Sequence, residues 1–189
     1  MFILIKMKLK YILSLLTVIS AGTMLNAQIY LGKSCEIKIF SDGPVEDIDA
    51  KNTSSKPILN TATNDIAIKI TIKGFDFDKE LMEEHFNEKY MESDKFPYAT
   101  FSGKINEKID YTKDGVHKTT VTGKLKIHDV EKERILDGTI TIKGGEVIIE
   151  SKFMVALKDH NVEIPTLVSQ NISEIIEVTI KSTLTEYKK

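Results

Sequence analysis

The chain of 189 residues contains no tryptophan and a single cysteine, Cys35. Cys35 cannot form an internal disulfide, so the stability of the protein has to come from its core and its backbone hydrogen bonds. We expect Cys35 to be a small buried apolar side chain rather than a redox group or a nucleophile.

The chain also lacks a basic cluster. Its formal net charge is −2, and the part after residue 27 is more acidic still, because residues 1–27 carry lysines but no acidic residue. Nucleic-acid binding depends on neutralising phosphates with Lys and Arg. The composition therefore predicts a protein that does not bind nucleic acid. Separately, the length of the chain suits one domain with its own hydrophobic core.

Catalytic signatures are absent as well. Neither a G-x-S-x-G elbow nor a Gly-rich phosphate loop occurs in the sequence. The acidic residues between Glu80 and Glu88 could form a pair of catalytic carboxylates, but the solvated face of a helix is the simpler interpretation. We predict that the protein is not an enzyme and needs no catalytic cofactor.

The four histidines show no H-x-H or H-E-x-x-H spacing, so no metal site is predicted. His85 falls on the apolar side of a predicted helix, where a packed histidine is the simpler interpretation. The pairs His128-Asp129 and Asp159-His160 lie at expected turns. There they would bond to neighbouring backbone, and the alternative is that the two pairs meet around a metal ion.

Residues 1–27 have the organisation of a secretory signal peptide. A basic stretch, Lys6–Lys10, precedes an apolar stretch, Tyr11–Ala21, and residues 25–27 (Leu-Asn-Ala) form an acceptable cleavage site. The alternative, a membrane anchor, would need a longer apolar run and a stop-transfer flank. No cysteine follows the apolar stretch, so a lipoprotein anchor is not expected. We predict that residues 28–189 form one exported domain, in the periplasm or secreted.

Most of residues 28–189 alternate between apolar and polar side chains, which is the pattern of half-buried β-strands. The clearest case is Ile66–Lys73, where isoleucines alternate with Ala, Lys and Thr. The same alternation appears in further segments: Cys35–Ile39, Val45–Ala50, Ile58–Leu59, Ala99–Ile105, Val121–Ile127, Leu136–Ile142, Val147–Leu157 and Ile176–Ile180. Turn signals occur at Asp114-Gly115, His128-Asp129 and Gly144-Gly145. Because parallel pairing needs long crossovers, about eight short antiparallel strands are predicted.

The segment between Gly74 and Gly103 breaks this alternation. Five side chains in it share one side at helical spacing: Leu81, Met82, His85, Phe86 and Tyr90. They predict an amphipathic helix that is capped by Asp78 and ends near Ser93. Such a helix in a β chain has a natural role, because its apolar face can cover the open end of a sheet or barrel.

An antiparallel sheet with one apolar face has to bury that face, either against a second sheet or by closing into a barrel. Gly103, Gly123 and Gly138 lie on the inward face in mid-strand, where glycines mark bends or a close approach. They favour a barrel with an interior cavity, and a two-sheet sandwich is the alternative. The predicted fold class is all-β with one helix, an antiparallel β-barrel of about eight strands with the amphipathic helix at its mouth.

Three blocks of sequence, in this order, resemble one known family: HFNEKYMESDKFPYATFSGKI (85–105), VTGKLKIHDVEKE (121–133) and DHNVEIP (159–165). The chain resembles the YceI-like family over essentially all of its mature part, and more closely the exported form common in Bacteroidota. The resemblance implies a lipocalin-like barrel whose cavity, in some members, holds a polyisoprenoid or another amphiphilic lipid. Many members have an Asp and a His-Ser pair on the first strand. The corresponding region, Gly32–Cys35, lacks both, so no head-group contact is carried over from that strand.

The predicted ligand-binding residues are inward-facing or helix-facing apolar side chains: Ile37, Ile39, Ile68, Ile70, Phe75, Phe77, Met82, Phe86, Phe101, Leu125, Ile127, Ile140, Phe153, Val155 and Val178. They would line a hydrophobic tunnel or, as the alternative, fill a solid core, as side chains do in small closed barrels. A tunnel predicts an exported carrier whose partner is an amphiphilic, isoprenoid-like lipid. A solid core predicts a non-enzymatic envelope-stress or interaction module. Transient membrane contact and a homodimer are further expectations.

Overall fold

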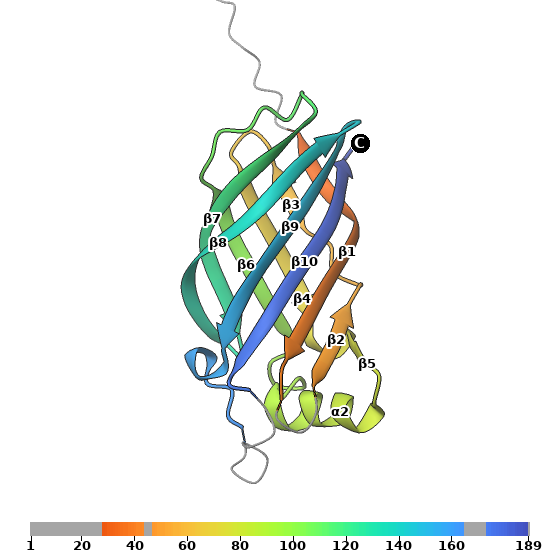
Figure 1. The fold of residues 1–189 in the computed structure, drawn as a ribbon, viewed down its shortest axis with the longest axis vertical. Coiled ribbons are helices and arrows are strands. Elements are labelled where there is room, and N and C mark those ends of the chain that lie inside the picture. Colours follow the sequence, from red (N-terminus) through yellow and green to blue (C-terminus); the bar gives the residue numbers. More distant parts are fainter. Residues whose placement is uncertain (1–27, 44–46, 165–172, 189) are drawn as a thin grey trace, which may run out of the picture.

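The computed structural model of the protein describes residues 28–43, 47–164 and 173–188. The signal peptide predicted for residues 1–27 and Val45 of the predicted second strand lie outside these described residues. The described part is wound into a tall barrel, with the helix across its lower end in Figure 1.

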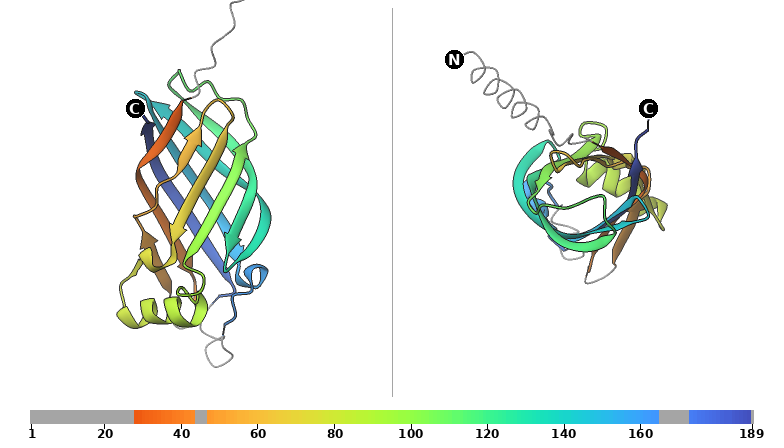
Figure 2. Two further views of the ribbon diagram at one scale, coloured as in Figure 1. Left: turned by 180° about the vertical axis from the view of Figure 1, so that it is seen from behind. Right: turned by 90° about the horizontal axis from the view of Figure 1, so that it is seen from above.

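Ten strands form one continuous sheet, with bounds β1 (Ile29–Ser41), β2 (Ile48–Asn52), β3 (Ile58–Asn60), β4 (Asp65–Thr71), β5 (Phe75–Phe77), β6 (Tyr98–Ile105), β7 (Gly115–Ile127), β8 (Val130–Lys143), β9 (Glu146–Ala156) and β10 (Ile175–Glu186). Neighbours run in the order β10-β9-β8-β7-β6-β4-β3-β1, and β1 pairs with β10 to close the ring. The view from above in Figure 2 shows this closure. The predicted antiparallel barrel of eight strands is therefore confirmed, and the sandwich alternative is wrong.

Strand β1 is the seam of the barrel. One edge of it pairs with β10 over Tyr30–Phe40. The other edge is shared, because Ile29–Leu31 pair with β3 and Ile37–Ser41 pair with β2. Strands β2 and β5 therefore continue the sheet beyond the ring, at the end of the barrel where the helix lies (Figure 1).

The tight turns follow from residues that tolerate left-handed backbone. His128 and Asp129 have φ of 50° and 63°, and Gly144 and Gly145 have φ of 58° and 82°, which suits two-residue hairpins. Both predicted turns are confirmed. The predicted turn at Asp114-Gly115 is wrong in detail, because β7 begins at Gly115 and the whole of residues 106–114 connects β6 to β7.

Gly103 and Gly123 face each other on β6 and β7. A Cβ atom on Gly123 would lie 2.5 Å from the backbone oxygen of Ser102 and 2.7 Å from the Phe101 ring, and one on Gly103 would lie 2.7 Å from the backbone oxygen of Thr122. Glycine is required here because the two backbones approach closely and an aromatic ring lies over them. The predicted role of these glycines is confirmed.

Asn52 connects strands β2 and β5, which lie outside the closed barrel, to the barrel strand β4. Its side chain is buried, and its Nδ2 donates to the backbone oxygen of Thr71 at the end of β4 (3.0 Å). Its Oδ1 accepts hydrogen bonds from Ser54 N, Ser54 Oγ and Ser55 Oγ at 3.0–3.1 Å. This network satisfies polar groups where the strands diverge and no ladder bonds are available.

The helix differs from the prediction in two ways. The α-helical part, α2, covers only Glu80–His85, and a π-helical turn, η2, continues it over Phe86–Tyr90. The N-cap is Lys79 without a side-chain cap bond, so the predicted Asp78 cap is wrong. The reason is that β5 runs to Phe77, and the carboxylate of Glu83 reaches back to the Phe77 N–H (3.4 Å).

Cys35 is buried and free, as predicted, and burial raises the pKa of its thiol. Among the described residues, no helix is both long and apolar enough to cross a membrane.

Candidate ligand-binding cavity

The barrel interior contains a cavity of about 210 Å³. It is larger than the apolar cavity of about 150 Å³ that admits benzene in an engineered protein core. Its wall comes from every strand of the ring except β3, together with β2, β5, η2 and the segment after β9. Most of the lining residues are aliphatic or aromatic, a minority such as Thr119, Ser151 and His160 are polar, and the surface that they present to the cavity is almost wholly apolar. The alternation of each strand explains this composition, because every second side chain points inward.

The predicted ligand-binding residues lie mostly on this wall. All of them line the cavity except Phe77 and Met82. Phe77 is buried and its ring packs on Phe86, with centroids 5.0 Å apart, and Met82 packs on the same apolar cluster. Phe77 therefore packs against the cover of the cavity, which is the helix formed by α2 and η2 (residues 80–90), Met82 is part of that cover, and neither residue lines the cavity.

The upper end of the barrel is packed solid. Leu59, Val147 and Leu184 are fully buried there, beside Ile105 and Ile140. Ile105 and Ile140 also line the cavity, so this cluster closes the cavity at its upper end.

The connection over residues 106–114 completes this upper end. Ile109 and Tyr111 are buried against the cluster, and burial raises the pKa of Tyr111 to about 12. The Tyr111 hydroxyl donates to Asn64 Oδ1 (3.2 Å), and Asn64 Nδ2 donates to the backbone oxygen of Glu107 (2.9 Å). These two bonds join the turn before β4, where Asn64 has φ of 61°, to the β6–β7 connection.

The lower end is closed by aromatic side chains of the cover. Phe86 of η2 makes an edge contact with Phe75, with centroids 5.6 Å apart, and packs on Phe77. Phe75 and Phe86 both line the cavity, together with Tyr90 and Met91. Aromatic pairs in this geometry add to the stability that burial gives.

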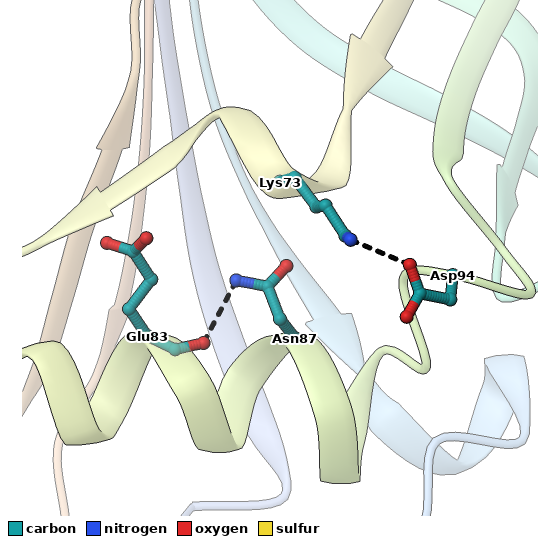
Figure 3. Close-up of polar contacts among 4 residues, drawn as sticks. All are labelled: Lys73, Glu83, Asn87 and Asp94. Carbon is teal, nitrogen blue, oxygen red and sulfur yellow. Dashed lines mark hydrogen bonds and ion pairs between the residues drawn. The ribbon is translucent and has the colours of Figure 1, made fainter.

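Figure 3 shows two polar contacts at this cover, one within the helix and one to the turn before β5. Asn87 Nδ2 donates to the backbone oxygen of Glu83 (2.9 Å), inside the helix. Lys73, from the 3₁₀ turn before β5, forms an ion pair with Asp94 (2.6 Å), just beyond η2. Both partners of that pair are exposed, so its contribution is small.

The corner after the cover is tied to the β7–β8 hairpin. His128 Nε2 lies 3.0 Å from the Glu92 carboxylate, and the His128 ring packs on Phe96 with centroids 4.1 Å apart. His128 therefore bonds a distant side chain, so the expectation that it would bond neighbouring backbone is wrong.

Strands β8 and β9 pair only along the upper part of the barrel wall. Their register runs from Gly138↔Ser151 to Lys143↔Glu146, so below Gly138 the two strands separate. The 3₁₀ turn η3 (Leu157–His160) covers the gap. Arg134 of β8 donates to the Asp159 carboxylate there, at 2.9 Å.

His160 is fully buried beneath this gap and lines the cavity. Its Nδ1 is 3.0 Å from the backbone oxygen of Val130, while its buried Nε2 has no hydrogen-bond partner among the residues that the structure describes. Burial is the main reason why the pKa of His160 lies below its usual value. The sequence places His160 at a turn, which is right, but no signal in it shows that the ring faces the interior.

Some further residues that line the cavity were not predicted, because they lie in segments without alternation. Met91 and Val162 lie outside the strands and outside the alternating segments, so a period-two pattern cannot find them. Among the described residues, no group of three or more His, Cys, Asp and Glu side chains gathers closely enough to hold a metal ion.

The architecture thus defines a class: a closed antiparallel β-barrel around an apolar cavity, covered by a helix at one end. The YceI-like domain matches residues 35–184 of this chain. The protein belongs to the YceI-like family.

Solved structures share this fold at low sequence identity. A polyisoprenoid-binding domain from Saccharophagus degradans, implicated in plant cell wall breakdown, aligns with a TM-score of 0.72 at 11% identity, over 86% of this chain and 100% of that one. BcnA of Burkholderia cenocepacia aligns with a TM-score of 0.66 at 14% identity, over 79% and 95%. A YceI protein of Campylobacter jejuni gives 0.54 at 21% identity, over 72% and 81%. A comparison with curated proteins returned no match.

Proposed function

We propose that this protein binds an apolar, isoprenoid-like lipid in the barrel cavity and carries it without catalysing a reaction. The observation that carries this proposal is the cavity of about 210 Å³ with its almost wholly apolar wall. A solid barrel core would leave no such space, because protein interiors are close-packed.

The apolar wall is sufficient for useful affinity. Burying about ten methylene equivalents at ~0.8 kcal/mol each corresponds to ~8 kcal/mol gross. That value is near micromolar affinity before the cost of ordering the lipid. The chain of the lipid, rather than its head group, would then supply most of the binding free energy.

The isoprenoid class is supported by family membership and by the polyisoprenoid-binding domain that shares the fold. The composition of residues 1–27 supports export, so we place the carrier in the periplasm or outside the cell. Leu81 on α2 was predicted to share the face that covers the barrel, but it is 61% exposed and points away from the core. It supports transient contact with a membrane at the helix end, where the lipid would be loaded.

Native mass spectrometry of the purified mature protein, followed by organic extraction, tests the proposal. We expect a stoichiometric lipid, or uptake of one after incubation with isoprenoid alcohols and quinones. A protein that stays empty under both conditions would overturn the carrier function and favour a solid-cored interaction module.

A matched pair of variants locates the site. Phe101→Asp places a charge on the cavity wall, and Ser102→Asp places the same charge on the exposed outer face of the same strand. We expect only the first to lose the lipid, because burying an unpaired charge is costly. Val178→Phe, which fills the cavity with an apolar ring, keeps the test decisive if Phe101→Asp does not fold. Lipid retained in full by Val178→Phe would place the binding site elsewhere.

A further inference from the structure

The polar groups of the cavity wall differ in whether they are already satisfied. Ser182 Oγ donates to the backbone oxygen of Ser34 (2.7 Å), and Ser151 Oγ donates to that of Asp137 (2.6 Å). Thr119 Oγ1 lies 3.3 Å from the backbone oxygen of Thr120. His160 lines the same cavity, and its buried Nε2 has no hydrogen-bond partner within the described part of the chain.

The hydrogen bond at His160 Nδ1 determines whether Nε2 is a hydrogen-bond donor or an acceptor. A backbone oxygen only accepts, so His160 Nδ1 must carry the proton that it donates to Val130. In a neutral imidazole the second nitrogen is then an acceptor. His160 is one of the residues that line the cavity, so Nε2 is the unsatisfied acceptor that this ring contributes there.

The surroundings of His160 keep the ring neutral. Burial is the largest cause that lowers its pKa, and Arg134 and Lys132 lower it further. Asp159 and the bond to Val130 act in the opposite direction, but Asp159 is already paired with Arg134. An unprotonated Nε2 therefore persists as a buried acceptor, and a buried acceptor without a donor is destabilising.

We propose that His160 Nε2 is the head-group contact of this cavity and that it selects lipids whose polar end carries a hydrogen-bond donor, such as a hydroxyl. This inference rests on the proposed lipid-binding function. Ethers, esters and quinone carbonyls offer only acceptors to this atom, so they would leave it unsatisfied. An alcohol or a hydroquinone would donate to it.

The test compares two lipids with the same chain. Delipidated mature protein is titrated with geranylgeraniol and with its methyl ether, which differs at the hydroxyl hydrogen. We expect the alcohol to bind about tenfold more tightly, the effect of one satisfied buried acceptor. Equal affinity for the two lipids would overturn the head-group assignment and leave the carrier function intact. If neither lipid bound, the carrier function itself would fail.

Variants connect the preference to the residue. His160→Phe removes the acceptor and keeps an aromatic ring, so we expect the alcohol preference to disappear while the affinity for the ether stays within about twofold. His117→Phe, at a histidine outside the cavity wall, is the control that keeps the preference. A preference that survives His160→Phe would contradict the proposal.

Nitrogen-15 NMR of the wild-type histidines adds a readout that needs no variant. A protonated Nδ1, and a shift at Nε2 when the alcohol binds but not when the ether binds, are the expected results. A proton found on Nε2 in the free protein would overturn the assignment even if His160→Phe failed to fold.

Discussion

The two ends of the barrel are built from the same kinds of side chain, yet only one of them leaves space. At the upper end Leu59, Val147 and Leu184 are fully buried, and residues 106–114 fold over them. At the helix end, Phe86 and Tyr90 are only half-buried and border the cavity. Composition alone therefore does not decide whether a barrel end is solid.

The difference lies in what covers each end. The upper connection is anchored through Asn64 and Tyr111 to the barrel itself, and its apolar side chains enter the core. The cover at the lower end is a short α-helix with a π-helical turn, attached by the exposed Lys73–Asp94 pair and aromatic edges. No side chain of α2 or η2 is fully buried, and local stability is lowest where buried apolar contacts are few. The helix end is therefore the side on which the barrel would open.

The largest effect is expected at the solid end. Leu184→Ala removes a fully buried side chain that has no cavity beside it, so we expect a loss of about 2–5 kcal/mol in the free energy of unfolding. Urea denaturation followed by circular dichroism measures this. A loss below about 1 kcal/mol would mean that the upper end is not packed as described.

Phe86→Ala should separate stability from function. The ring is half-buried, so we expect a smaller loss of about 1–2 kcal/mol in the free energy of unfolding. It also closes the cavity, so dissociation of a bound fluorescent isoprenoid should become several-fold faster. Stopped-flow release to empty vesicles gives the rate. An unchanged rate would show that the helix end is not the exit.

Acid should weaken the protein through His160, in the lower half of the barrel. His160 stays neutral in the folded protein because its pKa is lowered, whereas the unfolded chain takes up a proton near pH 6.5. The contribution of His160 to the free energy of unfolding is therefore present above about pH 6.5 and declines as the pH falls towards the lower folded-state pKa. At the upper end, Tyr111, with a pKa of about 12, and Asp110, with a pKa of about 2, do not titrate in this range.

The measurement is the thermal midpoint between pH 7 and pH 5 for the wild type and for His160→Gln. We expect a shallower decline in the variant, because glutamine takes up no proton. Parallel curves would assign the acid sensitivity to other groups.

The smallest effect is expected from Lys73→Ala. Its ion pair with Asp94 is exposed, so the free energy of unfolding should change by no more than about 0.5 kcal/mol. Double-mutant analysis with Asp94→Ala measures the coupling, and a coupling above about 1 kcal/mol would show that the pair does hold the cover in place.

Much of this fold could be predicted because alternation is a local property. The strand from Ile66, the hairpins at His128-Asp129 and Gly144-Gly145, and the inward glycines Gly103 and Gly123 are all visible in short windows of sequence. Most of the cavity wall follows from the same pattern, since a residue that faces inward in a closed barrel must face the core or the cavity.

Local patterns of side chains thus specify every strand except β5, the apolar faces of those strands and the presence of one amphipathic cover. They do not specify that β2 and β5 leave the ring, that η3 brings His160 against the cavity, or that one end is solid while the other is hollow. The physical reason is that these features depend on where segments distant in sequence meet and how fully they fill the space between them. No local pattern of side chains specifies that volume.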